Sequence, residues 1–350
     1  MFLLLFTFIL ALGLSLYLTP LSMEAARTLG IMAEPDGELR THKEAVPYLG
    51  GMAVYLSLLI ALAVAVDFSP RMLGLLLGTT IILMVGLIDD FGVMTAKMKL
   101  FGQFLAAVAL IKGGVVVELQ IFRELNWPYD LPLLSWGVSI LWLTGIANAV
   151  NFLDIEDGLA AGVAACCCPA LIAIAWINGN TAEMLFTAAL LGALIGFLRY
   201  NAACSGAKIY LGDAGSLMLG MTLAALAMMG EYSIKNDLAA VAPIIILGVP
   251  CFEIGVTMLA RLRKGIPVYY GSPDHVSKRL HFAGLSKRNV VLLHCFASLV
   301  LGGVAILAVL SSIRVSIILV SATIGVGLVT AFLLLRIKTP TPEMPGDSHE

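Results

Sequence analysis

Residues 148–162 read Asn148-Ala-Val-Asn151-Phe-Leu-Asp154-Ile-Glu156-Asp157-Gly158-Leu-Ala-Ala-Gly162, a polar stretch between two apolar segments. The flanking segments, 133–147 and 159–177, are each long enough to cross most of a bilayer. A carboxylate at bilayer depth costs about 2.5–3.5 kcal/mol, so this cluster belongs at a membrane surface or in a wet cavity. Its oxygen atoms suit a hard divalent cation or a sugar-nucleotide ligand; the alternative is an ordinary polar turn between two helices.

The composition of the whole chain is that of a membrane protein. Its 350 residues are 60% hydrophobic and 13% charged, and the mean hydropathy is +0.97. These values exclude a soluble globular domain of this length and are typical of a polytopic membrane protein. The net charge of −2 argues neither for nor against binding to nucleic acid. No basic tract supports such a partner, so we expect none. The six cysteines form no disulfide or metal-binding pattern.

Length and hydropathy predict an all-α fold with eleven transmembrane helices. Pro243 and Pro250 interrupt the ninth segment, so a count of ten is the alternative. The segments are approximately 2–19, 49–66, 72–88, 100–117, 134–152, 160–177, 183–198, 215–230, 239–258, 290–310 and 315–335. We expect residues 1–338 to form one integral membrane domain, followed by a polar, disordered cytoplasmic tail over 339–350.

The distribution of positive charge predicts the orientation. Loops with an excess of lysine and arginine stay in the cytoplasm. With the N-terminus outside, the external segments hold few of the 21 lysines and arginines, namely Arg71, Lys112, Arg123, Lys235 and Arg314. The sequence therefore predicts an external N-terminus, a cytoplasmic C-terminus and a place in the cytoplasmic (inner) membrane as a multi-pass protein.

Four polar clusters fall on the same side of this predicted topology. They are Asp89-Asp90 after the third segment, 148–157 after the fifth, Asn201 with 210–216 between the seventh and eighth, and Ser272-Pro-Asp274-His275 in the largest loop. Aspartate, asparagine and histidine played no part in assigning the topology. Scattered structural polar residues would lie on both faces, so this convergence predicts one cytoplasmic active-site cleft.

The residue types in these clusters indicate phosphoryl chemistry. Five carboxylates in one place would repel each other unless a cation such as Mg²⁺ joined them, coordinated by one or two of them and by substrate phosphates; they are Asp89, Asp90, Asp154, Asp157 and Asp213. Basic side chains that could neutralise phosphate oxygens are Lys43, Lys97, Lys99 and Arg261.

Two further features support a phosphate ligand. Gly212 and Gly215 flank Asp213 and would let backbone N–H groups approach a ligand just before a helix begins. His275 could donate a hydrogen bond to phosphate or act as an acid or base. Each of these signals taken alone also fits a helix end, a plain loop or a structural histidine.

Taken together and in order, these motifs resemble a known family. They are Leu39-Arg-Thr-His42-Lys43, Gly86-Leu-Ile-Asp89-Asp90-Phe, residues 148–159, Tyr210-Leu-Gly212-Asp213-Ala-Gly-Ser216 and Ser272-Pro-Asp-His275. Over roughly residues 29–285 the chain is similar to the polyprenyl-phosphate N-acetylhexosamine-1-phosphate transferases of glycosyltransferase family 4. The resemblance implies ten or eleven transmembrane helices and a magnesium-dependent reaction, with Mn²⁺ as the alternative ion. In that reaction a UDP-N-acetylhexosamine and polyprenyl (undecaprenyl) phosphate give polyprenyl diphosphate-sugar and UMP.

The resemblance also implies roles for individual residues. Asp213 matches the magnesium ligand, with Asp90 and Asn151 as further metal ligands, and Asp89 and Asp90 match the pair that handles the lipid phosphate. His275 matches the first histidine of the last cytoplasmic loop and is expected to be catalytic with these aspartates. Residues expected to bind substrate are Lys43, Lys97, Lys99, Asn148, Asn151, Asp154, Asp157, Asn201, Gly212 and Arg261.

Two departures from the family pattern bear on specificity. The usual Asp-Gly-x-Asp-Gly reads Asp154-Ile-Glu156-Asp157-Gly158 here, so an isoleucine replaces a glycine of the cleft lining. The usual cluster of histidines is reduced to His275-Val-Ser-Lys278-Arg279. The second departure favours an enzyme that initiates a surface glycan, such as lipopolysaccharide O-antigen or teichoic acid, over a phospho-N-acetylmuramoyl-pentapeptide transferase of peptidoglycan synthesis.

We therefore expect a membrane transferase of the 2.7.8 class with a UDP-sugar and a polyprenyl phosphate as substrates; whether it forms a homodimer is open. The rival from another class is a secondary transporter, whose ionisable residues would lie near mid-bilayer in two related halves. The clusters lie instead at one face, and the sequence has no such halves.

Overall fold

The computed structural model describes residues 1–33, 45–117, 132–202, 206–267 and 273–340. In these ranges the chain is almost entirely helical. The strands found there are β1 (Met32–Ala33) and β2 (Val46–Pro47), a short antiparallel pair.

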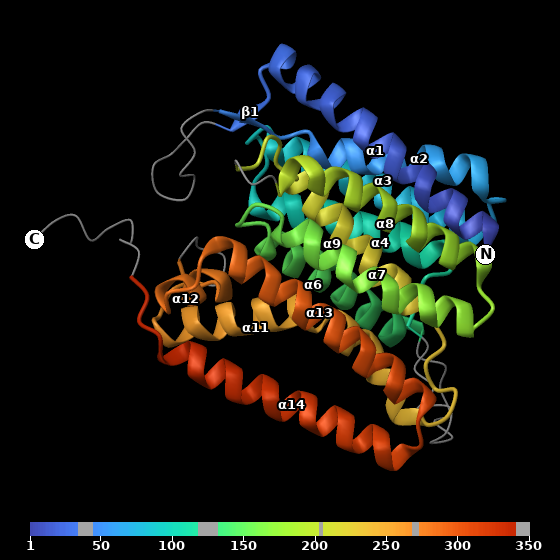
Figure 1. Ribbon diagram of the computed structural model, residues 1–350, viewed down its shortest axis with the longest axis vertical. Coiled ribbons are helices and arrows are strands. Elements are labelled where there is room, and N and C mark those ends of the chain that lie inside the picture. The colour runs from blue at the N-terminus through green and yellow to red at the C-terminus, as the bar shows by residue number, and fades with distance from the viewer. Residues whose placement is uncertain (34–44, 118–131, 203–205, 268–272, 341–350) are drawn as a thin grey trace, which may run out of the picture.

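In the described ranges up to Met229, the chain forms eight helices, which Figure 1 shows side by side in a bundle. They are α1 (Phe2–Leu29), α2 (Gly50–Ala65), α3 (Pro70–Asp90), α4 (Ala96–Lys112), α6 (Pro132–Leu153), α7 (Leu159–Ile177), α8 (Thr181–Asn201) and α9 (Gly212–Met229). The remainder comprises η1 (Asp237–Val241), α10 (Ala242–Ile246), α11 (Gly248–Arg263), α12 (Val276–Phe282), α13 (Lys287–Leu310) and α14 (Ile313–Arg336).

Each predicted apolar segment overlaps a helix, although α4 ends five residues before the predicted 100–117 does and the segment 239–258 is broken. η1 and α10 meet α11 at an angle of 72°. The break falls at Leu247, between the two prolines that the sequence placed there, Pro243 and Pro250. A proline cannot donate the helical hydrogen bond and clashes with the preceding turn, so a bend at this point has a local cause.

The lengths of the helices fit a chain that crosses a membrane several times. Within the described ranges, eight helices are long and apolar enough to span a bilayer, and the bent pair makes up to nine. Helices α2 and α4 are shorter, with 16 and 17 residues. The molecule is an all-α, multi-pass membrane protein.

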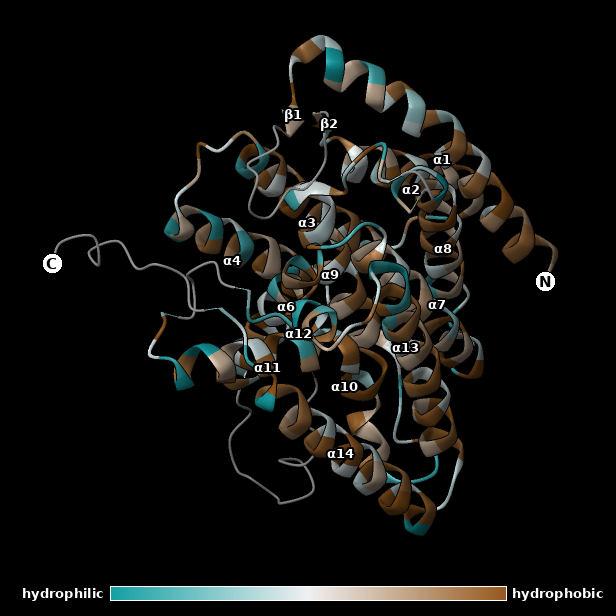
Figure 2. Ribbon diagram, turned by 60° about the vertical axis from the view of Figure 1, so that its left-hand side comes forward, coloured by the Kyte–Doolittle hydropathy of each residue, from teal (hydrophilic) through white to brown (hydrophobic). Residues whose placement is uncertain are grey.

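Helix α9 lies at the centre of the bundle, with α3 and α6 packed against it (Figure 1). The most apolar window of α9 is 89% buried, against 6% for that of α14. Figure 2 shows α13 and α14 as predominantly hydrophobic at the edge of the molecule, whereas hydrophilic residues gather around α12. An apolar helix exposed on most of its surface requires lipid around it, so the outer helices face hydrocarbon while α9 is covered by protein.

Local sequence sets where several helices begin. Ser69 accepts a hydrogen bond from the backbone N–H of Met72 at the start of α3, and Pro70 occupies the first turn. Thr95 caps α4 in the same way through Met98 N. A hydroxyl at this position satisfies a backbone donor that has no partner within the helix. Helix α9 has no such cap of its own.

Candidate active site

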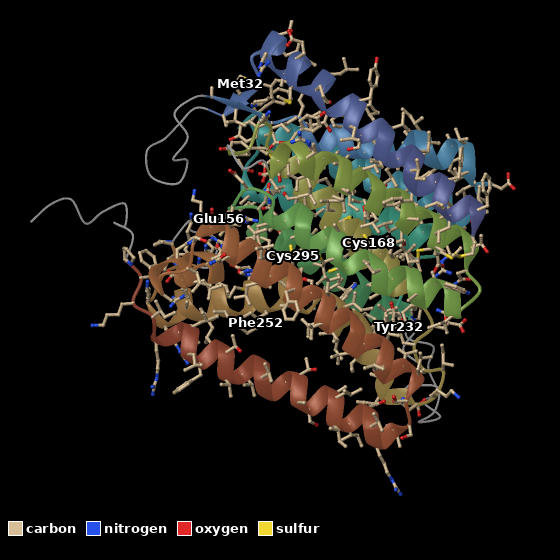
Figure 3. All side chains as sticks on the ribbon, in the orientation of Figure 1. Met32, Glu156, Cys168, Tyr232, Phe252 and Cys295 are labelled. Atoms are coloured by element: carbon tan, nitrogen blue, oxygen red, sulfur yellow. The ribbon has the colours of Figure 1, made fainter. Side chains whose placement is uncertain are left out.

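A pocket of about 650 Å³ opens where several helices end. It lies at the carboxyl ends of α3, α6 and α8 and at the amino ends of α9 and α13. Its lining is Met32, Tyr48, Asp89, Asp90, Phe91, Gly92, Asp154, Ile155, Glu156, Asp157, Asn201, Tyr210, Gly212, Asp213, Lys278 and Lys287. Figure 3 shows Glu156 at this end of the molecule and Tyr232 at the opposite end. The polar clusters that the sequence predicted to converge therefore share one end of the bundle.

Asp89 and Asp213 face the same cation. The Nζ atom of Lys99 lies 2.6 Å from Asp89 Oδ2 and 3.0 Å from Asp213 Oδ2. The other oxygen of Asp213 accepts a 2.6 Å hydrogen bond from Asn151 Nδ2. Asn151 in turn donates to Ser216 Oγ at 2.9 Å. Helices α3, α4, α6 and α9 thus bring two carboxylates, one ammonium group and one amide together.

Asp90 supplies the cap that α9 lacks in its own sequence. Its Oδ1 atom accepts the backbone N–H of Asp213 at 2.7 Å, and its Oδ2 atom accepts that of Ala214 at 3.0 Å. A carboxylate at a helix N-terminus is stabilised both by these bonds and by the helix dipole. Asp90 therefore holds in place the turn that carries Asp213.

Close backbone packing makes this arrangement possible. A Cβ atom on Gly86 would lie 2.4 Å from the carbonyl oxygen of Asp213, so a side chain there would push α3 away from α9. Gly212 has φ of +73°, a left-handed conformation that glycine adopts without strain, and a Cβ atom on it would lie 2.7 Å from Asp90 Oδ2. These glycines allow α3 and the start of α9 to approach within hydrogen-bonding distance.

Asp157 and Asn201 hold two loops of the pocket together. Asn201 accepts the backbone N–H of Gly158 at 3.0 Å and donates to the carbonyl of Ile209 at 2.9 Å. Asp157 Oδ2 accepts the backbone N–H of Ala207 at 3.0 Å. The loop after α6 is therefore joined to the segment that leads into α9.

Asp154 lies in the same loop and in the pocket wall. Burial raises the pKa of its carboxyl well above its usual range, and the negative charges of Asp213, Asp90 and Asp157 raise it further. Ionising every carboxylate of the pocket at once is therefore unfavourable, and a cation bound among them would oppose this effect.

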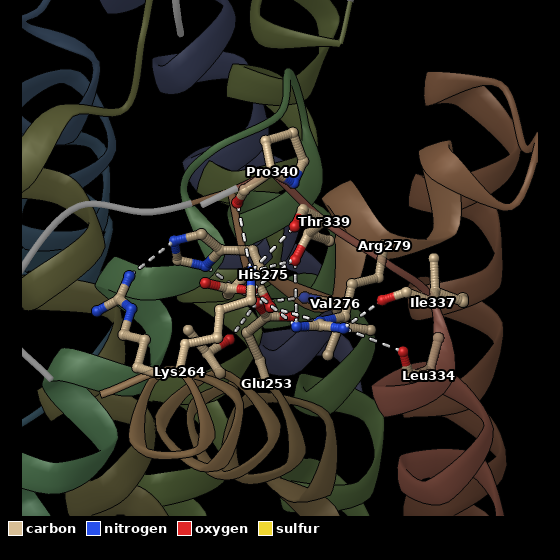
Figure 4. A network of polar contacts seen from close by, with 12 residues as sticks. Glu253, Lys264, His275, Val276, Arg279, Leu334, Ile337, Thr339 and Pro340 are labelled. Atoms are coloured by element: carbon tan, nitrogen blue, oxygen red, sulfur yellow. Dashed lines mark hydrogen bonds and ion pairs between the residues drawn. The ribbon is translucent and has the colours of Figure 1, made fainter. Parts of the chain in front are cut away.

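His275 and Arg261 belong to a second cluster beside the pocket. His275 Nδ1 donates to Glu253 Oε1 at 3.1 Å, and Arg261 Nη2 lies 3.5 Å from His275 Nε2 (Figure 4). The carboxylate fixes which ring nitrogen carries the proton, so Nε2 is the acceptor in the neutral ring. The ring of Phe152 packs against both, 5.5 Å from the imidazole centroid and 5.1 Å from the guanidinium carbon.

Lys99 and Asn151 contact Asp213 but are not part of the pocket lining, and neither are Asn148 and Lys97. Asn148 exchanges hydrogen bonds with buried Gln103, at 2.7 and 3.2 Å, and so joins α6 to α4. Lys97 is exposed on the first turn of α4. Lys43 lies outside the residues that the structure describes.

The sequence interpretation did not single out several residues that the structure places at the site. Glu156, Lys278 and Lys287 line the pocket, and Glu253 orients His275. The sequence shows Glu253 after Pro250, where the resembled family usually has an aspartate, but this substitution alone predicts no contact with His275. Glu156 directly follows Ile155, the first departure from the family pattern, and Lys278 lies in the reduced histidine cluster, the second departure.

The donor set fits a hard divalent cation held by few protein ligands. In the described ranges no group of three or more His, Cys, Asp and Glu side chains is placed to hold a metal ion. However, Mg²⁺ is commonly bound by one or two carboxylates, with water and substrate phosphates completing its octahedron. Asp89 and Asp213 already converge on the ammonium group of Lys99, so they provide such a pair.

Comparison with known proteins now gives the family. The Glycosyl transferase family 4 profile matches residues 72–231. A phospho-N-acetylmuramoyl-pentapeptide-transferase of Halalkalibacterium halodurans is 32% identical over 318 residues, which are 83% of this chain and 92% of the relative. The chain belongs to glycosyl transferase family 4.

Other members of the family are similar over nearly the whole chain. The "probable undecaprenyl-phosphate N-acetylglucosaminyl 1-phosphate transferase" of Bacillus subtilis is 29% identical over 344 residues, 98% of this chain and 92% of its own length. The decaprenyl-phosphate N-acetylglucosaminephosphotransferase of Mycobacterium leprae is 28% identical over 343 residues, 89% of this chain and 85% of its own length. The resemblance drawn from the motifs is confirmed.

Proposed function

We propose that this protein transfers N-acetylglucosamine-1-phosphate, or that of a closely related N-acetylhexosamine, from a UDP-sugar to polyprenyl phosphate. The products are polyprenyl diphosphate-sugar and UMP, and the reaction is the first membrane step of surface-glycan synthesis. The observation that carries the proposal is that Asp89 and Asp213 line a pocket at one end of an apolar helical bundle and are joined to Lys99 and Asn151. The names of the similar family members support it.

The pocket is proposed to open on the cytoplasmic side of the inner membrane. Of the 21 lysines and arginines, the polar end holds most, including Lys97, Lys99, Lys278 and Lys287, and the positive-inside rule places such an end in the cytoplasm. In this orientation the N-terminus is external and eleven segments cross the membrane, with α2 and α4 as the short ones. A UDP-sugar would reach the pocket from the cytoplasm, and a polyprenyl phosphate from the inner leaflet.

In the proposed reaction, an oxygen of the lipid phosphate attacks the sugar-linked phosphorus of the donor. A new P–O bond forms there, the bond to the bridging oxygen breaks, and UMP leaves with that oxygen. Phosphate monoesters have a second pKa of about 6, so the attacking group is largely ionised at neutral pH. The main task of the protein is then to position two anionic substrates and offset their charge.

The side chains would divide this task as follows. Lys99 offsets charge between the reacting phosphates, and Asn151 orients Asp213. Asp90 holds the first turn of α9, whose backbone N–H groups point toward the pocket end of the helix. Asp89 and Asp213 would hold Mg²⁺, which when bound neutralises charge on the donor diphosphate. Asp90 and Asn151 as metal ligands remain predictions.

The test is transfer of label to lipid. Purified protein is incubated with undecaprenyl phosphate, Mg²⁺ and radiolabelled UDP-N-acetylglucosamine, UDP-N-acetylgalactosamine or UDP-N-acetylmuramoyl-pentapeptide. We expect label from a plain UDP-N-acetylhexosamine in the lipid fraction and none from the pentapeptide donor. Turnover of the pentapeptide donor alone would assign the peptidoglycan reaction instead, and no transfer from any donor would refute the proposed function.

A further inference from the structure

One side chain in the pocket wall collects three cationic groups from the elements facing it. Glu156, in the loop between α6 and α7, is 6% exposed. Its Oε1 atom lies 2.8 Å from Lys278 Nζ and 3.2 Å from His281 Nε2, and its Oε2 atom lies 3.6 Å from Lys287 Nζ. Lys278 and His281 are on α12, and Lys287 begins α13. We call these four residues the Glu156 cluster.

The cluster joins the loop after α6 to α12 and α13 through side chains. Glu156 is more than a hundred residues from its partners: Lys278 is 122 residues away and His281 is 125. A buried carboxylate without partners is costly, so these contacts fix α12 against the loop that carries Asp154 and Asp157. The cluster therefore determines where α12 lies relative to the pocket.

The charge of the cluster is not balanced internally. One carboxylate faces two ammonium groups and an imidazole, and both lysines line the pocket. The carboxylates Asp89 and Asp213, by contrast, share the single ammonium of Lys99. The pocket thus has an acidic wall on α3 and α9 and a wall of net positive charge on α12 and α13. An anionic ligand between the walls is favoured on the positive side without a metal ion.

We propose that Glu156 is a positioning residue that holds the ammonium group of Lys278 in the pocket as a binding point for a phosphate of the nucleotide-sugar donor. The proposal rests on the proposed function, since it concerns the donor of that reaction. The donor is the substrate concerned because its diphosphate carries a second phosphate besides the reacting one, whose charge is assigned to Lys99. Lys278 contacts the donor, and Glu156 acts through Lys278.

The proposal predicts a change in the KM for the donor but not in kcat. Lys278→Met keeps most of the side-chain length but removes the charge, and should raise KM for the UDP-sugar about tenfold, since a charge-assisted hydrogen bond is lost. The kcat at saturating donor and KM for the lipid phosphate should change less than about twofold, as expected for a contact made equally in ground and transition states. Lys278→Arg should retain a donor KM near that of the wild type. Glu156→Gln should raise the donor KM in the same direction as Lys278→Met, by a smaller factor.

A matched control comes from the other end of the bundle. Glu183 is also buried and paired with a cation, Arg71, at 3.5 Å, but lies at the start of α8, away from the pocket. Glu183→Gln should leave the donor KM unchanged. Competitive inhibition supplies a second readout: Lys278→Met should weaken inhibition by UDP about tenfold and leave inhibition by uridine, which has no phosphate, unaltered.

The outcomes distinguish the two proposals. Absence of transfer by the wild type refutes the proposed function. Normal transfer by the wild type, with donor KM unchanged in both Lys278→Met and Glu156→Gln, refutes the role of the Glu156 cluster and leaves the function standing. Equal weakening of UDP and uridine in Lys278→Met would also overturn it, because the effect would then not depend on phosphate.

Discussion

Asp90 and Asp213 lie side by side, yet their oxygens have different partners. Both oxygens of Asp90 accept backbone N–H groups at the start of α9. Those of Asp213 accept side-chain donors from Lys99 and Asn151. A carboxylate bonded to side chains can exchange those partners for a metal ion without breaking a helix cap. At the residue scale, Asp213 is therefore the stronger candidate for metal binding.

Asp213→Asn tests this role. An amide has the shape of the carboxylate but not its charge, so it should bind Mg²⁺ poorly and fail to balance Lys99. We expect turnover to fall at least about a hundredfold, a loss typical of removing a key electrostatic group from an active site. Expression and thermal midpoint should change little. The matched control is Asp237→Asn, an exposed aspartate of η1 at the other end of the molecule, and near-normal turnover of Asp213→Asn would show that the metal is held elsewhere.

At the scale of elements, α12 is a short helix held by contacts on both sides. One side carries the Glu156 cluster. On the other, buried Arg279 donates to Asp274 Oδ1 at 2.7 Å and to the carbonyls of Leu334 and Ile337 at 3.1 and 2.9 Å (Figure 4). Asp274 Oδ1 also accepts a hydrogen bond from Lys264 Nζ at 2.8 Å. The end of α14 is thereby joined to the segment that carries His275.

Removing Arg279 should loosen this junction. Arg279→Ala leaves the buried carboxylate of Asp274 without one of its cations and frees two carbonyls at the end of α14. Breaking a buried ion pair in this way costs about 3–5 kcal/mol. We expect a clear fall in the thermal midpoint of the purified protein in detergent and a lower kcat through displacement of His275. Arg288→Ala, at an exposed position on α13, should behave as the wild type; equal midpoints for the two variants would contradict the role given to Arg279.

The Glu156 cluster also predicts a pH dependence of stability. Burial acts to raise the pKa of Glu156, but the hydrogen bond and charge of Lys278, together with the charges of Lys287 and His281, outweigh it and hold the pKa below its ordinary value of 4.5. A lowered carboxyl pKa means that the stabilisation is present above the unfolded value and is lost as pH falls through the folded one. The thermal midpoint should therefore fall as pH drops below about 4.5. Glu156→Gln should lower the midpoint at neutral pH and reduce this acid-dependent fall, and an unaltered acid profile in that variant would count against the cluster.

At the scale of the whole molecule, polar side chains are sorted to one end of an apolar bundle. The helix that presents Asp213 is the most enclosed of the candidate spans, and the most exposed ones, α1, α13 and α14, lie at the periphery. Protein thus surrounds the element that must be rigid, while lipid surrounds the elements that only need to be apolar. The proposed reaction requires such an arrangement, because a soluble nucleotide-sugar and a lipid phosphate would meet at a membrane surface.

Labelling of single cysteines tests the proposed orientation. In a variant lacking the six native cysteines, cysteine is introduced at Ala96, Arg288 or Lys235, all exposed positions. In intact cells an impermeant thiol reagent should label Lys235→Cys and spare Ala96→Cys and Arg288→Cys, because these two lie at the pocket end. All three should react after permeabilisation. The reverse pattern would place the pocket outside the cytoplasm.

Sequence alone determined the apolar segments, the prolines that break one of them and the residue types that gather at the pocket. These follow from local physical rules: hydropathy over some twenty residues, hydroxyl caps such as Ser69 and Thr95, and the cost of a charge in hydrocarbon. Topology assigned from lysine and arginine also predicted that Asp89, Asp154, Asn201 and Asp213 would meet, and all four line one pocket.

Only the tertiary structure decided which side chain holds which. Asp90 caps α9 by accepting the N–H of Asp213, 123 residues away. Lys99 contacts Asp213, 114 residues after it, and Glu156 is paired with Lys278 of α12 across 122 residues. No spacing along the chain encodes such pairs, because they depend on how closely helices pack, and that distance is set by the absence of side chains at glycines such as Gly86 and Gly212. The same reason explains why Asn148 and Arg261, with residue types suited to the site, lie beside the pocket rather than in its wall.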